Sequence, residues 1–275
     1  MQKRHIDRQQ YFNEQYESTK KFILPYILKE VNNGNLFNNK EIRVLEIGCG
    51  EGGNLLPFLE AGCECCGVEI SAISYNNALK FYEDNPLKSN LQLINKNIFD
   101  TTSDETGGVF DIVVLRDVIE HIPDQELFLR HLKNFVSQDG ILFIAFPPWR
   151  MPFGGHQQII KKKWVSIIPY IHISPKPIYT LILKCLRIPK NEINGLLNIA
   201  STGISIKRFK KIIQKEDYLV IKKTHWLINP NYQIKFGLKP RKAYRFFQIP
   251  YLQDFYTTAV YYLLRQKIEK IRAKE

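Results

Sequence analysis

A run of apolar residues that passes directly into a glycine-rich loop constrains this chain more than any other feature. Residues 42–47 predict a buried strand, and residues 48–53, Gly-Cys-Gly-Glu-Gly-Gly, follow it without a break. Glycines let the backbone turn tightly and let a ligand approach the main chain, while the next helix offers free N–H groups at its start. Gly48, Gly50 and Gly53 satisfy the dinucleotide pattern G-x-G-x-x-G. Glu69, about 20 residues further on at the end of a second predicted strand, can accept hydrogen bonds from both hydroxyls of a ribose.

The strands and helices predicted around this loop alternate along the chain. We expect strands at 42–47, 65–70, 91–94, 110–115, 141–146 and 218–228, a last strand or helix at 255–264, and helices at 54–59, 71–81, 125–136 and 206–214. Such alternation predicts an α/β fold with a doubly wound, mostly parallel sheet, in which ligands bind outside the carboxyl ends of the strands. Near-helical spacing of apolar residues within 5–31 predicts one or two amphipathic helices ahead of the sheet.

This pattern divides the chain into four segments. Residues 1–40 form an N-terminal helical cover, and residues 41–148 form the ligand-binding core. The alternation stops in residues 149–203, a stretch of prolines, lysines and aromatic residues that is too long for an ordinary connection, and we interpret it as an inserted lid. Residues 204–275 complete the core with its last helix and strands and end in a basic tail.

The sequence resembles the class I S-adenosylmethionine-dependent methyltransferases. Residues 44–50, Val-Leu-Glu-Ile-Gly-Cys-Gly, are similar to the first motif of that family, and Glu69 matches its acidic residue that holds the ribose. Residues 110–115 and 118–124 are similar to the fourth strand and the loop beside the methyl donor. The resemblance implies a seven-stranded Rossmann-like sheet with the lid after the fifth strand, the cofactor S-adenosylmethionine, and methyltransferase activity.

The resemblance also implies which residues hold the cofactor. Asn97 stands where the family has an acid that accepts a hydrogen bond from the adenine amino group, Ile98 would pack on the ring, and Asp100 competes with Asn97 for this assignment. Tyr11 and Tyr16 of the cover would lie across the cofactor and exclude water, although helix packing explains them equally well. The full set is Tyr11, Tyr16, Glu46, Gly48, Cys49, Gly50, Asn54, Glu69, Ile70, Asn97, Ile98, Leu115 and His121.

Three residues near the expected methyl donor are catalytic candidates. His156 stands on a glycine-flanked loop after the fifth strand, and the ordinary pKa of histidine suits a base for an oxygen acceptor, or a group that positions it. Asp117 could orient the acceptor and Arg116 could bind an acidic one, although a surface ion pair explains both equally well. We interpret His121 as an anchor of the pocket loop. Glu120 and His121 could both bind a metal ion, but no further clear ligand follows, so no metal site is predicted.

Charge is divided unevenly along the chain. The net charge of +12 separates into −7 for residues 1–149 (14 basic, 21 acidic) and +19 for residues 150–275 (25 basic, 6 acidic). An anionic small acceptor, an anionic membrane surface or RNA would each explain the basic half. The aliphatic residues and prolines among the lysines of 161–186 favour a lid or an interfacial segment over nucleic acid.

Targeting signals are not expected. The polar first residues lead into no apolar region, no run of 18 apolar residues occurs, and the five cysteines form no regular framework. Cys63, Cys65 and Cys66 are expected to be buried thiols. We therefore predict a cytoplasmic protein, with peripheral contact to an anionic membrane surface as an option.

Together these features predict methyl transfer to a small, lipid-like or glycan-like acceptor, on oxygen. Three alternatives stay open: an RNA methyltransferase, an NAD(P)-dependent oxidoreductase that uses the glycine loop, and a cofactor-binding protein without catalysis. The sequence does not predict the oligomeric state.

Overall fold

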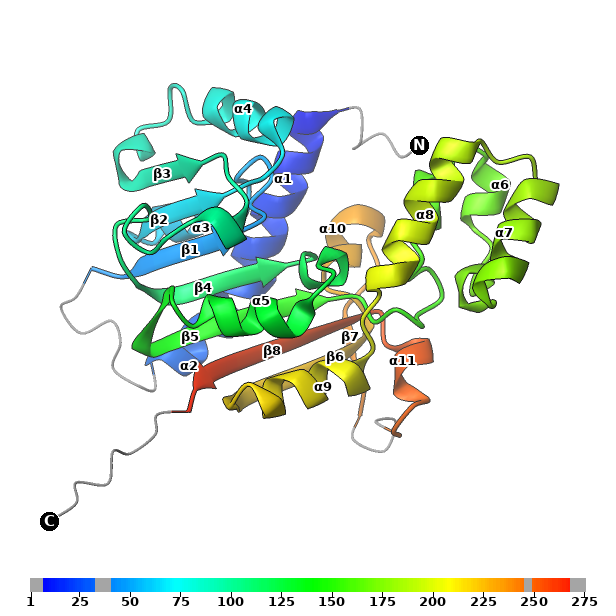
Figure 1. Ribbon diagram of the computed structural model, residues 1–275. Coiled ribbons are helices and arrows are strands. Elements are labelled where there is room, and N and C mark those ends of the chain that lie inside the picture. The colour runs from blue at the N-terminus through cyan, green and yellow to red at the C-terminus, as the bar shows by residue number, and fades with distance from the viewer. Residues whose placement is uncertain (1–6, 33–40, 245–248, 268–275) are drawn as a thin grey trace, which may run out of the picture.

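The computed structural model describes residues 7–32, 41–244 and 249–267. Within these residues, one sheet of eight strands has the order β3-β2-β1-β4-β5-β8-β6-β7 (Figure 1). The strands are β1 (Arg43–Ile47), β2 (Glu64–Val68), β3 (Leu91–Ile94), β4 (Phe110–Arg116), β5 (Val136–Phe146), β6 (Tyr218–Ile228), β7 (Arg241–Lys242) and β8 (Ala259–Gln266). Neighbours from β3 to β5 are parallel, whereas β8 is antiparallel to both β5 and β6. The two-residue strand β7 adds an edge to the seven strands that the resemblance implied.

The predicted α/β alternation is confirmed, with one boundary wrong. The predicted helix 125–136 ends early, as α5 (Gln125–Leu132), because Val136 already pairs with Phe110 at the start of β5. The uncertain element at 255–264 is the strand β8, preceded by the short helix α11 (Gln253–Tyr256). The end of the predicted basic tail, residues 268–275, lies outside the described residues.

The N-terminal cover is a continuous helical stretch. α1 (Arg8–Ser18) passes through a π-helical turn (Thr19–Ile23) into α2 (Leu24–Asn32). The Asp7 side chain caps α1 by accepting a hydrogen bond from a first-turn N–H group. The widened turn immediately precedes Pro25, which has no N–H group to continue a regular helix. Residues 1–6 and 33–40 of the predicted cover lie outside the described residues.

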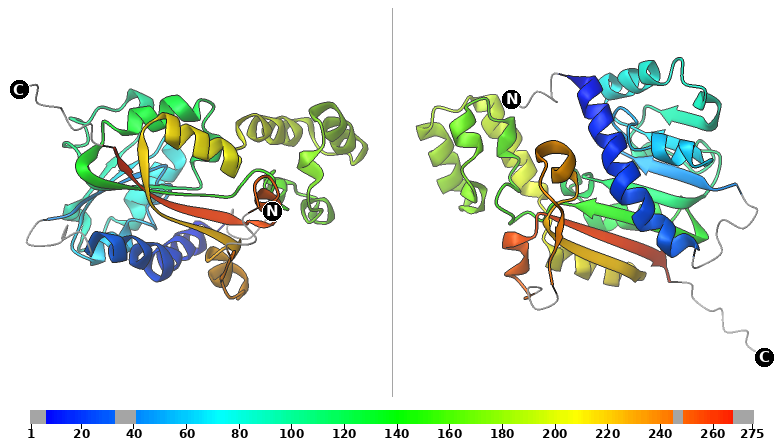
Figure 2. Two further views of the ribbon diagram at one scale, coloured as in Figure 1. Left: turned by 90° about the horizontal axis from the view of Figure 1, so that it is seen from below. Right: turned by 180° about the vertical axis from the view of Figure 1, so that it is seen from behind.

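Helices cover both faces of the sheet (Figure 2). On one face, α5 and α9 (Ile206–Lys215) bury apolar side chains such as Phe128 and Phe209. On the other, the cover and α3 (Leu56–Glu60) bury Phe12, Ile27 and Phe58. The predicted caps are confirmed, since the side chains of Ser71 and Ser205 begin α4 (Ala72–Phe81) and α9. Cys63, Cys65 and Cys66 are buried thiols, as expected.

Residues 149–203 fold as a helical unit beside the sheet (Figures 1 and 2). It contains α6 (Lys163–Ser166), α7 (Lys176–Cys185) and α8 (Lys190–Thr202). An apolar cluster of its own holds it together, formed by Ile160, Val165, Tyr179, Leu183, Ile188, Ile193 and Leu196. The two ends of the insertion meet, because the Trp149 N–H donates to the Ile204 carbonyl at 2.8 Å. Of the helices in the described ranges, none combines the length and the apolar character needed to cross a membrane.

Candidate active site

The glycine loop adopts a backbone conformation that glycine permits. Gly48 has φ +69°, and a Cβ atom there would lie 2.7 Å from Val118 Cγ2; Gly50 has φ +57°. Glu69, 8% exposed at the end of β2, accepts hydrogen bonds from the N–H groups of Gly50 (2.8 Å) and Ser71 (2.7 Å), one on each oxygen. Each oxygen keeps a second acceptor position. A bare main chain next to an anchored carboxylate fits a ligand that carries a ribose, as S-adenosylmethionine does.

The third glycine of the dinucleotide pattern serves helix packing. A Cβ atom on Gly53 would lie 2.5 Å from the Phe12 carbonyl oxygen and 2.9 Å from the Gln15 Cβ atom. Both neighbours belong to α1, so the cover presses directly on the loop. Contact between loop and cover therefore accounts for this glycine, and the pattern gives no support to the oxidoreductase alternative.

The residues predicted to hold the adenine follow β2 and β3, whose ends are joined. Asn95 Nδ2 donates to the Glu69 carbonyl at 2.7 Å. Ile70 is 68% exposed beside this junction, while Ile98 is buried. The Asn97 side chain accepts a hydrogen bond from the N–H of Phe99 at 3.1 Å and retains one acceptor position on the same oxygen. The adenine contacts of Ile70, Asn97 and Ile98 stay predictions.

Arg116 lies inside the protein. Its side chain is 7% exposed, and its terminal nitrogens donate to Ser18 Oγ (2.9 Å), Thr19 Oγ1 (3.3 Å) and Asn54 Oδ1 (2.7 Å). The Thr19 hydroxyl also donates to Asn54 Oδ1 at 2.8 Å. This network ties the cover and the glycine-loop region to the end of β4. The contact of Arg116 with an acidic acceptor stays a prediction, because Arg116 lines a small cavity beside Gly48 although groups of the protein accept hydrogen bonds from both of its terminal nitrogens.

Four predicted cofactor contacts lie beneath the loop and support it. Glu46 is 1% exposed and accepts a hydrogen bond from Asn54 Nδ2 at 2.6 Å. Burial raises the pKa of Glu46 to about 8, against the opposing effects of the Asn54 hydrogen bond and the Arg116 charge. Cys49 and Leu115 are each 1% exposed. These four side chains pack within the protein and support the loop, and their cofactor contacts stay predictions.

The two tyrosines of the cover point to different places. Tyr11 lines the cavity described next. The hydroxyl of Tyr16 instead donates to the Glu60 carboxylate at 2.9 Å. Residues five apart on a helix point about 140° apart, so both tyrosines cannot face one ligand. The cofactor contact of Tyr16 stays a prediction, and this geometry favours Tyr11 over Tyr16 for it.

A cavity of about 340 Å³ opens at the carboxyl ends of β4 and β5. Its walls come from α1, the loop after β4, the first loop of the lid, and the segment around α10 (Asn231–Phe236). A smaller cavity of about 100 Å³ beside Gly48 shares Tyr11, Asp117, Asn231 and Lys235 with it. The larger cavity is lined by Arg8, Tyr11, Asp117, Glu120, His121, Pro147, Met151, Phe153, His156, Ile159, Asn229, Asn231, Tyr232, Lys235 and Thr258. The structure thus brings Asp117, His121 and His156 together next to the glycine loop.

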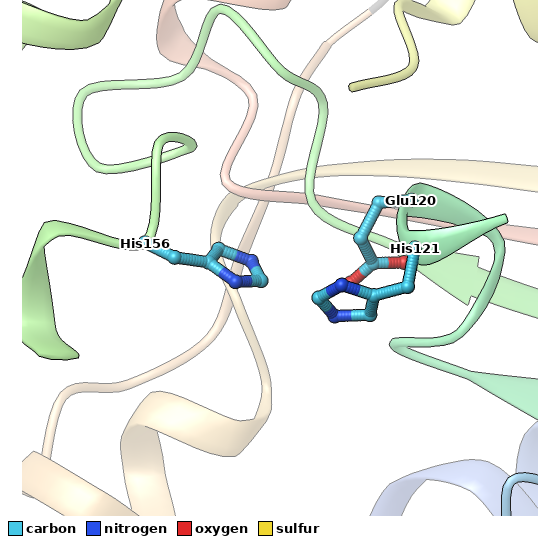
Figure 3. A group of neighbouring side chains, drawn as sticks. All are labelled: Glu120, His121 and His156. Atoms are coloured by element: carbon cyan, nitrogen blue, oxygen red, sulfur yellow. The ribbon is translucent and has the colours of Figure 1, made fainter. Parts of the chain in front are cut away.

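Three of these polar side chains face one another (Figure 3). Glu120 and His121 come from the 3-10 turn η5 (Ile119–His121) after β4, and His156 lies opposite on the lid loop. The ring centroids of the two histidines are 5.0 Å apart. Loss of water around the His121 ring lowers its pKa, an effect that the Asp117 carboxylate opposes. Burial raises the pKa of Glu120 well above its usual range, and the charge of Asp117 raises it further.

Sequence reasoning missed the wall supplied by the segment after β6. Asn229, Asn231, Tyr232 and Lys235 line the cavity from there. α10 has only six residues, too few to show a helical period. The turn-forming pair Asn229-Pro230 before it and Gly237 after it, in the left-handed conformation, are the local signals that could have marked it.

Comparison with known proteins identifies the family of this chain. A family model described as a methyltransferase domain matches residues 12–175. The ubiquinone biosynthesis O-methyltransferase of Rhodopseudomonas palustris (strain TIE-1) is 34% identical over 104 residues, which are 38% of this chain and 39% of that protein. The (S)-tetrahydroprotoberberine N-methyltransferase of Eschscholzia californica is 29% identical over 103 residues, 37% of this chain and 28% of that protein. The match thus spans well under half the length of these curated relatives.

Solved structures share the fold across nearly the whole chain. An S-adenosylmethionine-dependent methyltransferase from Clostridium acetobutylicum ATCC 824 superposes with a TM-score of 0.56 at 10% identity, covering 92% of both chains. The magnesium protoporphyrin IX methyltransferase of Synechocystis PCC 6803, solved with bound SAH, gives a TM-score of 0.51 at 15% identity, covering 91% of this chain and 84% of that one. With the family match to residues 12–175, the sheet order and the glycine loop, this chain belongs to the methyltransferase domain family of class I S-adenosylmethionine-dependent methyltransferases.

Proposed function

We propose that this chain transfers a methyl group from S-adenosylmethionine to an oxygen of a small, lipid-like or glycan-like acceptor bound in the 340 Å³ cavity. The observation that carries this proposal is the meeting of two cavities at Asp117, one beside Gly48 and the other lined by His121 and His156. A methyl donor and an acceptor must lie close together and in line, which two adjoining cavities permit. The volume suits a small molecule, since ligand pockets are commonly about 300–1,000 Å³.

The residues around the two cavities have separable tasks in this reaction. S-adenosylmethionine, when bound, supplies a methyl group on a positively charged sulfur that an aligned lone pair can attack. The main chain at Gly48 and the Glu69 carboxylate are the groups that would hold it. Asp117 and His156 line the larger cavity, where they would orient an acceptor hydroxyl and one of the two would remove its proton. Arg8, which pairs with the buried Glu51 of the glycine loop, closes the cavity on the cover side.

Isothermal titration calorimetry tests the cofactor part of the proposal. We expect S-adenosylmethionine to bind and NAD not to bind, and Glu69→Gln to weaken that binding at least about tenfold, the effect of losing roughly one hydrogen bond to a charged group. Glu126→Gln, the same change on the surface helix α5, is the matched control and should bind normally. Binding of NAD in place of S-adenosylmethionine would refute the proposal.

The acceptor part is tested with labelled S-adenosylmethionine and fractionated cell extract. Label in the lipid or small-molecule fraction supports the proposed acceptor class, whereas label confined to RNA rejects it. With an acceptor in hand, His156→Ala should leave cofactor binding intact and slow turnover by about 10²–10⁴-fold, as expected for loss of a group that acts on the acceptor proton.

We also propose that the lid rests on an anionic membrane surface. Trp164, Ile167 and Leu181 are 56%, 68% and 61% exposed on this unit. Lysines 161–163 and Lys184 belong to the same unit. Exposed apolar side chains among basic ones are typical of interfacial segments. The proposal predicts salt-sensitive sedimentation with phosphatidylglycerol vesicles and none with phosphatidylcholine vesicles, and preferential binding to RNA would reject it.

A further inference from the structure

Three side chains of the metal-binding kind converge at the cavity from two separate segments. Glu120 and His121 project from η5, and His156 projects from the lid loop on the opposite side (Figure 3). One ligand atom from each of the three lies within 4.8 Å of the others. The third ligand that the sequence did not supply for the Glu120–His121 pair is therefore brought there by the fold.

The carboxylate of Glu120 is a second, independent sign of a ligand. The residue is 3% exposed, and among the described residues neither of its oxygens has a hydrogen-bond partner. Burial of a carboxylate without a partner is costly, and native proteins avoid it unless a cation or a donor completes the site. The residue also lines the cavity described above.

Both sides of the cluster are held firmly. The Thr202 hydroxyl at the end of α8 donates to the Glu120 carbonyl at 2.6 Å. On the lid side, Gly154 and Gly155 make close contacts that fix the loop before His156: a Cβ atom on Gly154 would lie 2.2 Å from the Trp149 carbonyl oxygen, and one on Gly155 would lie 2.3 Å from the neighbouring His172 Cβ atom. Ligands on rigid supports lose little entropy when an ion binds.

We propose that Glu120, His121 and His156 bind one divalent transition-metal ion. Two imidazoles with one carboxylate suit Zn²⁺, Co²⁺ or Fe²⁺, whereas Mg²⁺ and Ca²⁺ prefer an all-oxygen set. With metal–ligand bonds of about 2.1 Å, ligand atoms lie roughly 3.0–3.4 Å apart, so binding requires the three ligand atoms to approach one another by about 1 Å. Three protein ligands leave positions open toward the cavity.

The open positions define the class of acceptor. An acceptor that offers an oxygen, or two neighbouring oxygens, completes the coordination and is held beside the cavity at Gly48. This step rests on the proposed function, while metal binding itself does not. In this arrangement His156 positions the acceptor through the ion, because a nitrogen that binds the metal cannot also take the proton of the acceptor.

Metal binding is measured on untagged protein that has been treated with EDTA and desalted. Titration with Zn²⁺ and Co²⁺, followed by calorimetry and by the visible absorption of Co²⁺, should show one ion per chain. Glu120→Gln, His121→Asn and His156→Asn should each lower the affinity by more than the 10–100-fold that loss of an outer partner costs. Glu126→Gln and His131→Asn, which remove the same groups outside the cluster, should retain the wild-type stoichiometry and affinity.

The thermal midpoint of unfolding shows whether each variant is folded. One equivalent of Zn²⁺ should raise this midpoint in the wild type and in both control variants, but in none of the three ligand variants. Absence of stoichiometric binding, or wild-type affinity in all three ligand variants, overturns the site. Acetohydroxamate, a chelator with two oxygens, should change the spectrum of the Co²⁺ form; an unchanged spectrum overturns the open positions. Binding of S-adenosylmethionine is measured separately, on metal-free protein in EDTA. Loss of this binding would refute the proposed function without bearing on the metal site.

Discussion

Arg116 provides a quantitative test of the network that fastens the N-terminal cover to the core. Arg116→Met keeps a long side chain but removes the hydrogen bonds to Ser18, Thr19 and Asn54. Hydrogen bonds to a charged group contribute about 1.5–3 kcal/mol each, so three would sum to roughly 4–9 kcal/mol. The sum overstates the loss because Thr19 and Asn54 also bond to each other and partly compensate.

The buried Glu46 carboxyl keeps the expected loss of unfolding free energy near the lower end of this range. Its pKa of about 8 keeps it mostly neutral at pH 7, so loss of the nearby Arg116 charge strands no buried anion. We therefore expect the free energy of unfolding to fall by about 3–5 kcal/mol, near the lower end of the sum for three hydrogen bonds to a charged group once partial compensation is allowed for. Urea unfolding followed by circular dichroism measures this change, and affinity for S-adenosylmethionine should fall with it. Arg208→Met, on an exposed position of α9, is the control and should change stability by less than about 0.5 kcal/mol. A wild-type urea midpoint combined with lost turnover would refute this reasoning. It would favour a contact of Arg116 with the acceptor instead.

Three further predictions concern the glycine loop, the ion pair between Arg130 and Glu216, and the lid. Gly48→Ala, whose Cβ atom would lie 2.7 Å from a neighbouring side chain, should weaken S-adenosylmethionine binding in calorimetry at least about tenfold. Gly62→Ala, also at positive φ but with no atom near the added Cβ, should bind S-adenosylmethionine normally. An equal loss of affinity in both variants would mean that backbone strain, and not the contact at Gly48, weakens binding. The hydrogen bond from Arg130 lowers the pKa of Glu216, so its stabilisation is present above the ordinary value of 4.5 and is lost as the pH falls through the lower folded-state value. Glu216→Gln should therefore lose less stability than the wild type in acid, and parallel denaturation curves would contradict this. Trp164→Glu should reduce sedimentation with phosphatidylglycerol vesicles without changing cofactor affinity, and undiminished sedimentation would remove the lid from the contact.

Features governed by local rules could be predicted from the sequence. The serines at 71 and 205 begin helices because a hydroxyl can cap the free N–H groups of the first turn, which needs only neighbouring residues. The glycine loop and Glu69 were likewise predictable, since parallel strands place their carboxyl ends at one edge of the sheet.

Features set by contacts distant in sequence could not be predicted. Arg116 looked exposed at the end of a strand, but the cover that buries it is almost 100 residues earlier. The partner of Glu120 and His121 lies in the insertion, and no periodicity reports where an insertion folds back. The end of the predicted helix at 136 was wrong for a related reason, because pairing with Phe110 outweighed the helical pattern.

The hydrogen bond between Trp149 and Ile204 has an evolutionary consequence. An insertion whose two ends sit side by side can be lengthened, shortened or exchanged without moving the strands that flank it. Such an exchange would keep the glycine loop, Glu69, Asp117 and Glu120, whereas His156 would be replaced together with the insertion. The insertion, with one of the three side chains of the cluster, can therefore be exchanged as one unit, while the glycine loop and Glu69 are kept with the sheet.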